Sequence, residues 1–148
     1  MQTNTVIQQT DKVLLFMGTI FRFSGLIKLL TELDPALRLD KSLKFLIPGE
    51  GEDFNRLHQL ANTLGLQNQV IMPGRIEYKL LADYLRLGHV ALLPFKQYLV
   101  THVALPGKVL QYLGCGLPTI STPLDGLQSM ILPNQGILYA SNMHDMAT

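Results

Sequence analysis

The stretch KVLLFM (Lys12–Met17) is apolar at every position after its first, and it ends at Gly18. An apolar run without alternating polar residues is typical of a strand covered on both faces. Leucines and isoleucines then recur at helical spacing between Leu26 and Leu33, and Asp34-Pro35 predicts the end of that helix. A buried strand followed by an amphipathic helix is the repeating unit of a parallel sheet.

The same alternation continues along the chain. Further strands are predicted at Leu43–Ile47, Gln69–Met72, His89–Leu93, Thr119–Ser121 and Ile137–Tyr139, and further helices at Phe54–Leu64, Leu80–Leu87, Lys108–Leu113 and around Leu127–Ile131. We therefore predict an α/β fold, a Rossmann-like doubly wound parallel sheet of about six strands. Residues 1–12 are expected to form a polar lead-in to one domain at 13–148, whose last helix starts near Asp145 and is cut off.

The composition of the chain limits the classes of function and the cellular compartment that fit it. The 148 residues carry a formal net charge of +1 with scattered basic residues, which argues against a nucleic-acid partner. Cys115 is the only cysteine, so an internal disulfide is excluded and the cytoplasm is the expected compartment. The apolar runs are too short to span a bilayer and no signal peptide is expected, although peripheral attachment to a membrane stays open.

In a doubly wound sheet, ligands bind outside the carboxyl ends of the strands. The loops expected at that edge are Thr19–Gly25, Pro48–Glu52, Gly74–Glu77, Phe95–Gly107 and Thr122–Gly126. Any binding site is therefore expected among these loops.

The segment LPGKVLQYLGCGLPTIS (Leu105–Ser121) holds the first candidate site. Pro106 and Gly107 open a helix whose first amides lack internal partners, so its start can bind an anion. Lys108 lies in that first turn, where a bound phosphate would make its charge favourable; a solvated lysine is the alternative. Arg22, after the first strand, could reach a diphosphate or be a surface arginine.

Other candidate residues carry weaker signals. The four histidines lack metal-ligand spacing, so no metal site is expected, and His58 and His89 are interpreted as structural. His102 remains a candidate ligand contact, and Asp125 fits either a helix N-cap or a ligand contact. The segment PGEGEDF lacks the third glycine of a dinucleotide fingerprint and follows the second strand, which disfavours an NAD-binding oxidoreductase.

Several segments occur together in a familiar order. They are LLFMGTI followed by Gly25-Leu26, KFLIPGEGEDFNRL, QVIMPGRI, HVALLPF, LPGKVLQYLGCGLPTIST with DGL behind it, and GILYA. In this order and spacing the chain resembles, from about Val13 to Thr148, the C-terminal domain of group one glycosyltransferases, which have the GT-B fold.

The resemblance implies a domain that binds a nucleotide diphosphate sugar, UDP- or GDP-linked, as substrate, with no cofactor and no metal. Transfer to the acceptor would take place, with retention, against an N-terminal acceptor domain supplied in cis or in trans. This chain alone is expected to transfer nothing. Gly74, Arg75 and Ile76 would lie along the nucleobase. Gly18, Leu105, Pro106, Gly107 and Gln111 would also contact the donor, with Gln111 at the ribose, and Arg22 and Lys108 are the catalytic candidates.

The chain also departs from the family pattern. The family's paired Arg and Lys fall at Thr19 and Ser24, its first motif Glu falls at Val103, and its ribose-binding Glu falls at Gln111. These departures deplete the electrostatic stabilisation of the leaving group. Three interpretations remain: a subfamily built on Arg22 and Lys108, a degenerate interaction module, or the matching half of a nucleotide-sugar epimerase.

Overall fold

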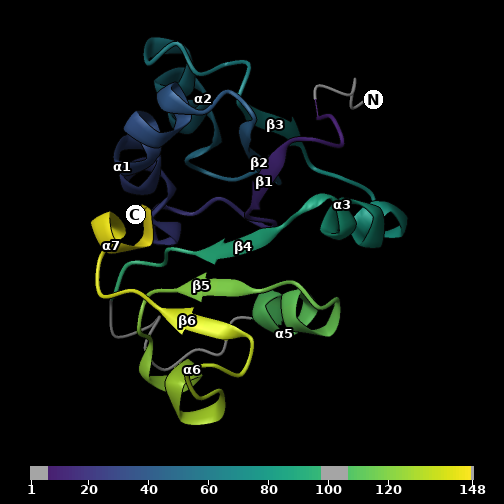
Figure 1. Cartoon of the computed structure of the whole chain (residues 1–148), viewed down its shortest axis with the longest axis vertical. Coiled ribbons are helices and arrows are strands. Elements are labelled where there is room, and N and C mark those ends of the chain that lie inside the picture. Colours follow the sequence, from purple (N-terminus) through teal and green to yellow (C-terminus); the bar gives the residue numbers. More distant parts are fainter. Residues whose placement is uncertain (1–6, 98–106, 148) are drawn as a thin grey trace.

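The computed structural model describes residues 7–97 and 107–147, whose strands form one parallel six-stranded sheet (Figure 1). The strands are β1 (Lys12–Leu15), β2 (Leu43–Pro48), β3 (Val70–Gly74), β4 (Val90–Leu93), β5 (Thr119–Ser121) and β6 (Ile137–Tyr139). Their order is β3-β2-β1-β4-β5-β6, and all five neighbouring pairs are parallel. The predicted Rossmann-like sheet is confirmed.

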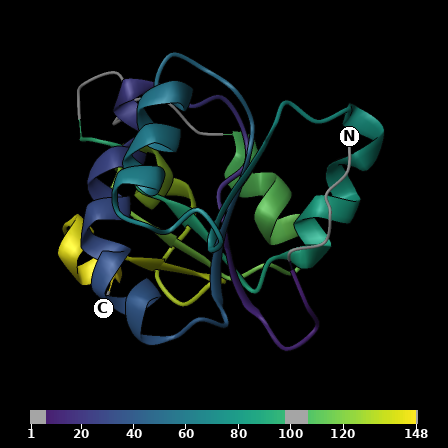
Figure 2. The same cartoon turned by 90° about the horizontal axis from the view of Figure 1, so that it is seen from above.

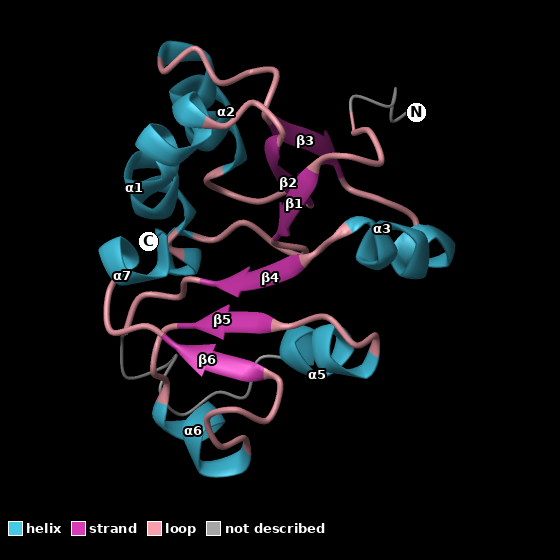
Figure 3. Cartoon of the chain, viewed as in Figure 1, coloured by secondary structure: helices cyan, strands magenta, loops and turns pink. Residues whose placement is uncertain are grey.

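Helices cover both faces of the sheet (Figures 2 and 3). They are α1 (Leu26–Leu39), α2 (Phe54–Thr63), α3 (Leu81–Leu87), α5 (Gly107–Gly114), α6 (Asp125–Met130) and α7 (Met143–Ala147), with 3-10 turns η1 (Arg22–Ser24) and η2 (Tyr78–Leu80). In Figure 2, α1, α2 and α7 lie on one side of the sheet and α3 and α5 on the other. None of the helices among the described residues has the length and apolar character to cross a membrane.

Each face of the sheet has its own hydrophobic core, and the neighbouring residues Leu15 and Phe16 contribute one side chain to each core. Phe16 packs with the leucines of α1 and with Phe45 of β2 in one cluster. Leu15, its neighbour, packs with Tyr84 of α3 and Tyr112 of α5 in the other. Successive side chains of a strand point to opposite faces, so burial on both sides explains why this segment is apolar throughout.

Helix α1 is longer than the sequence predicts. It continues through Asp34-Pro35 to Leu39, so the prediction that it stops at this pair is wrong. Proline removes one helical hydrogen bond, but Leu37, beyond it, is fully buried in the core. An ion pair of 2.7 Å between Asp34 Oδ1 and Arg38 Nε also spans the proline, one helical turn apart.

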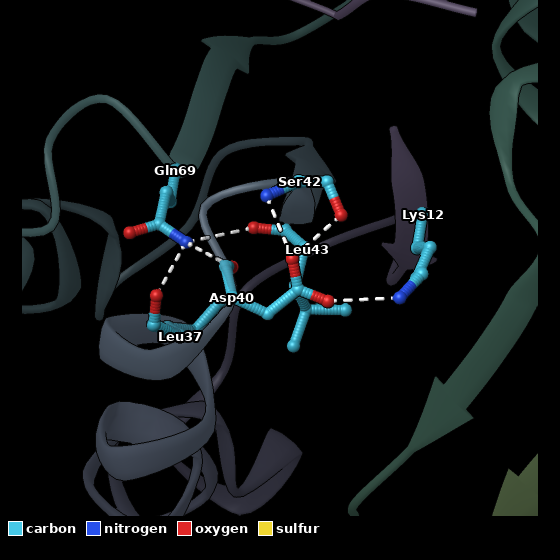
Figure 4. A network of polar contacts seen from close by, with 6 residues as sticks. All are labelled: Lys12, Leu37, Asp40, Ser42, Leu43 and Gln69. Carbon is cyan, nitrogen blue, oxygen red and sulfur yellow. Dashed lines mark hydrogen bonds and ion pairs between the residues drawn. The ribbon is translucent and has the colours of Figure 1, made fainter. Parts of the chain in front are cut away.

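The end of α1 is fixed to three strands by a polar network (Figure 4). The Asp40 carboxylate accepts hydrogen bonds from the Ser42 amide and hydroxyl, and pairs with Lys12 Nζ at 2.9 Å. These contacts hold the pKa of Asp40 down at about 2, with the Ser42 hydroxyl as the main cause. Buried Gln69 donates through Nε2 to the carbonyls of Leu37, Asp40 and Leu43.

Candidate functional site

The loops that follow β1, β2 and β3 are joined by backbone hydrogen bonds. The Gly18 amide donates to the Pro48 carbonyl at 3.0 Å, and the Ile20 amide donates to the Glu50 carbonyl at 2.9 Å. The Gly49 amide donates to the carbonyl of Gly74 at 2.8 Å. The sheet pairing thus extends past the strand ends, and the three loops form one continuous floor at the carboxyl edge.

Two glycines permit this close approach. A Cβ at Gly49 would clash with the carbonyl oxygen of Gly18, and a Cβ at Gly51 would clash with that of Ile20. The PGEGEDF segment therefore serves to pack one loop against another. Its glycines are explained by this contact between loops, without a dinucleotide.

A hollow of about 540 Å³ opens above this floor. Its lining includes Gly18, Arg75 and Ile76, three of the predicted donor-binding residues, together with Glu50 and Tyr78. Gly74, also predicted to contact the donor, precedes Arg75 in the chain and is not among the residues that line the hollow. Segments far apart in the sequence are thus brought together at the sheet edge where the topology predicts a ligand.

Lys108 reaches the same edge from α5. Its Nζ lies 5.1 Å from the ring centre of Phe16 and 4.8 Å from that of Phe95, distances at which a cation is attracted to aromatic faces. Its Cε lies 2.8 Å from the position that a Cβ on Gly18 would take. Lys108 is partly buried beside Gly18. This differs from the alternative, a solvated lysine.

The position of Lys108 coincides with the reversal in strand order. Phe16 follows β1 and Phe95 follows β4, and these two strands are neighbours at the centre of the sheet. This is the switch point at which doubly wound sheets bind ligands. Burial lowers the pKa of Lys108 to about 8, because removing the ammonium from water disfavours its charged form.

Tyr112 fixes α5 against β1, a role that no motif in the sequence indicates. The tyrosine is fully buried, and its hydroxyl accepts a hydrogen bond of 2.9 Å from the Met17 amide. Burial raises the pKa of this hydroxyl, so it stays protonated at physiological pH. Because Tyr112 lies one helical turn after Lys108, this contact sets the position of the lysine beside Gly18.

The remaining predicted residues of α5 lie on its surface. Gly107 begins the helix and is exposed, and Gln111 is exposed three residues beyond Lys108. Residues three apart are neighbours on a helix, so Gln111 and Lys108 present adjacent side chains. Leu105, Pro106, His102 and Val103 fall outside the described residues.

The structure does not bring Arg22 to this hollow. Arg22 lies in η1, with a side chain 71% exposed and its Nε 3.9 Å from Asp53 Oδ1. It lines a second hollow, whose lining contains neither Gly18 nor Arg75. Of the two positions where the family has cations, Thr19 lines the first hollow, whereas Ser24 is buried and accepts a hydrogen bond from the Phe21 amide.

Two histidines and one aspartate lie away from the first hollow. His89 accepts a hydrogen bond from the Val13 amide at 3.0 Å, and His58 stacks on Phe54, which fits structural roles for both. The N-cap of α6 is Leu124 and not Asp125, because the helix already begins at Asp125, so the N-cap alternative is wrong. Within residues 7–97 and 107–147, no three potential metal ligands are grouped.

Comparisons with known proteins agree with the fold. A family model described as "Glycosyl transferases group 1" matches residues 2–148. A curated relative from Arabidopsis thaliana, one of the subunits of phosphatidylinositol N-acetylglucosaminyltransferase, is 28% identical over 119 residues, which are 80% of this chain and 26% of that protein. The chain thus spans about a quarter of that relative.

Solved structures of low sequence identity share the fold. The C-terminal domain of a group 1 family glycosyl transferase (LpcC) from Francisella tularensis superposes with a TM-score of 0.72 at 17% identity, over 93% of this chain and 71% of that one. A TarM mutant from S. aureus, in complex with fondaparinux, alpha-GlcNAc-glycerol and UDP, has a TM-score of 0.72 at 19% identity, covering 94% and 27%.

Proposed function

Because this chain belongs to the group 1 glycosyl transferase family, we propose that the hollow beside Lys108 binds the nucleoside diphosphate of a UDP- or GDP-sugar donor. The observation that carries the proposal is the position of Lys108 beside Gly18, between β1 and β4. Gly18 has no side chain, so the Lys108 side chain packs where a Cβ would lie, and its ammonium is held against the loop that lines the hollow, where it would meet a diphosphate.

The proposal assigns a role to each part of the site. Arg75 and Ile76 line the hollow at the end of β3 and would contact the nucleobase. Lys108 and the start of α5, with Leu105, Pro106 and Gly107, would meet the phosphates, and Gln111 would bond a ribose hydroxyl. Arg22 has no part in this site, since its guanidinium lies beside Asp53.

In sugar transfer, the bond from the sugar to the diphosphate breaks and negative charge grows on the departing oxygen. A fixed cation beside the phosphates stabilises that charge more in the transition state than in the ground state. Lys108 is the described residue placed to do this.

The whole enzyme would need an acceptor domain, in cis or in trans. It would transfer a hexosyl group with retention, either at the cytoplasmic side of a membrane or free in the cytoplasm.

A non-catalytic module is the second candidate. It is favoured by Thr19 and Ser24, which leave the loop after β1 without the two cations of the family pattern. Such a module would keep the fold and its loop packing and would lack affinity for nucleotides.

Calorimetric titration of the chain with UDP, GDP and NAD tests the proposal. We expect saturable binding of one nucleoside diphosphate, at least tenfold weaker in Lys108→Ala, and no binding of NAD. Lys41→Ala is the matched control, since it removes an exposed lysine between α1 and β2. No binding of UDP or GDP to the folded chain would contradict the donor site and favour the non-catalytic module.

A further inference from the structure

The second hollow lies beside the first turns of α1 and α2. It has a volume of about 210 Å³, and it is lined by Arg22, Gly25, Ile27, Lys28, Asp53, Arg56 and Lys96. These residues come from η1, from the starts of α1 and α2, and from the segment after β4. None of them lines the hollow proposed for the donor.

The charge of this hollow is out of proportion to the chain. The whole sequence balances 12 Lys and Arg against 11 Asp and Glu. The hollow, by contrast, gathers Arg22, Lys28 and Arg56 around one carboxylate, that of Asp53. Like charges held this close repel one another, and a low-dielectric wall strengthens the field inside the hollow. A bound anion would remove that repulsion.

Asp53 pairs with two of the cations, Arg22 and Arg56, but its single carboxylate cannot balance the charge of both. The carboxylate is 5% exposed, and its Oδ1 lies 3.0 Å from Arg56 Nη1 and 3.9 Å from Arg22 Nε. One carboxylate balances one guanidinium, and each guanidinium has five N–H donors in a fixed fork. Donors therefore remain on both arginines beyond those that face Asp53.

The surrounding backbone adds to the positive field. Gly25 caps α1 without a side chain, and a Cβ at this position would clash with the Pro94 carbonyl oxygen. The first-turn amides of α1 thus lack a side-chain partner from the cap and contribute partial positive charge. The Lys96 amide donates to the Phe23 carbonyl at 2.7 Å, which fixes the segment after β4 against η1.

From these observations we infer that the hollow is a second anion site, which binds a phosphate group separate from the donor diphosphate. Phosphate accepts several hydrogen bonds and is the group that bidentate arginine donors recognise best. The volume exceeds that of several water molecules at about 30 Å³ each, so the group enters with part of its hydration. The phosphate is carried either by a soluble ester or by a phospholipid headgroup.

Phosphate titration followed by amide NMR shifts tests the site. At constant ionic strength, inorganic phosphate should produce saturable shifts at Ile27, Lys28 and Arg56. The double variant Lys28→Gln/Arg56→Gln should bind phosphate at least tenfold more weakly, and Lys28→Glu, which keeps the pairs of Asp53, should do the same. The control Lys41→Gln/Arg86→Gln removes the same charge far from the hollow and should leave phosphate binding unchanged.

Vesicle flotation separates the two sources of phosphate. Binding to phosphatidic acid in phosphatidylcholine, lost in the double variant and kept in the control, would identify a lipid headgroup. Saturable binding of free phosphate without flotation would identify a soluble ester. Shifts that fail to saturate, or an equal loss of phosphate binding in the control variant, would overturn the site. UDP affinity should change less than twofold in the double variant, which keeps this result independent of the donor site.

Discussion

At the scale of single residues, Lys108 has three properties that suit it to bind an anion. Its ammonium lies over the rings of Phe16 and Phe95, packed against Gly18 where that residue has no side chain, in the first turn of α5. The rings attract the cation without neutralising it. Burial meanwhile lowers its pKa to about 8, so its charge is sensitive to pH just above neutrality.

This sensitivity predicts how nucleotide binding depends on pH. A lysine that must be charged to bind the diphosphate is charged at pH 7 and loses its proton as the pH rises through 8. Nucleoside diphosphate affinity should therefore be about tenfold weaker at pH 9 than at pH 7, by proton linkage. Calorimetry at both pH values measures this ratio.

Lys108→Arg provides the comparison, because a guanidinium stays protonated over the whole range. Its affinity should be the same at pH 7 and pH 9, whatever its absolute value. An equal loss in Lys108→Arg and in the natural chain would mean that another group titrates.

The sequence identified Lys108 as a cation in a first helical turn, but it could not show what holds it. Phe16, Phe95 and Tyr112 meet the lysine or its helix only because β1 and β4 are neighbours and α5 packs across them. For a related reason, the sequence could not show that Arg22 lines a separate hollow from Gly18. Its direction depends on η1 and on the pairing with Asp53, and neither leaves a pattern in the sequence.

At the scale of elements, Gln69 joins α1 to the sheet. Its side-chain nitrogen, Nε2, donates hydrogen bonds to the carbonyls of Leu37, Asp40 and Leu43, at the end of α1 and the start of β2. Replacing Gln69 with Leu would leave buried carbonyls without a donor, which costs about 1–3 kcal/mol. We expect urea unfolding of Gln69→Leu to show a loss of unfolding free energy of that size.

Gln67→Leu is the control, because Gln67 is exposed two residues away in the same segment. Its free energy of unfolding should stay within about 0.5 kcal/mol of the natural chain, as for most surface substitutions. If both variants lost the same stability, the network of Figure 4 would have no special role.

Element positions followed from the sequence wherever burial and pattern agree. Thr119–Ser121 and Ile137–Tyr139 were predicted with their observed bounds, because glycine, proline, serine or asparagine residues closely flank each segment. The end of α1 was missed because the local rule for proline conflicts with the burial of Leu37. Packing of a core residue can outweigh the loss of one helical hydrogen bond.

At the scale of the whole molecule, the strand order puts both of the hollows for which anion binding is proposed at one edge. All six strands are parallel, so every loop that follows a strand emerges on the same side. The first hollow, proposed for the donor, lies at the ends of β1, β2 and β3, and the second hollow lies at the starts of α1 and α2. A partner domain placed against this edge would cover both.

Amide NMR shifts in the intact chain would map the nucleotide contacts and test the donor site most directly. With the nucleoside diphosphate that calorimetry selects, we predict shifts at Gly18 and Ile76, on two loops, and at Gly107, the first residue of α5, and none at Lys28 or Arg56. Shifts confined to Lys28 and Arg56, or absent from Gly18, would contradict the claim that the diphosphate binds beside Lys108.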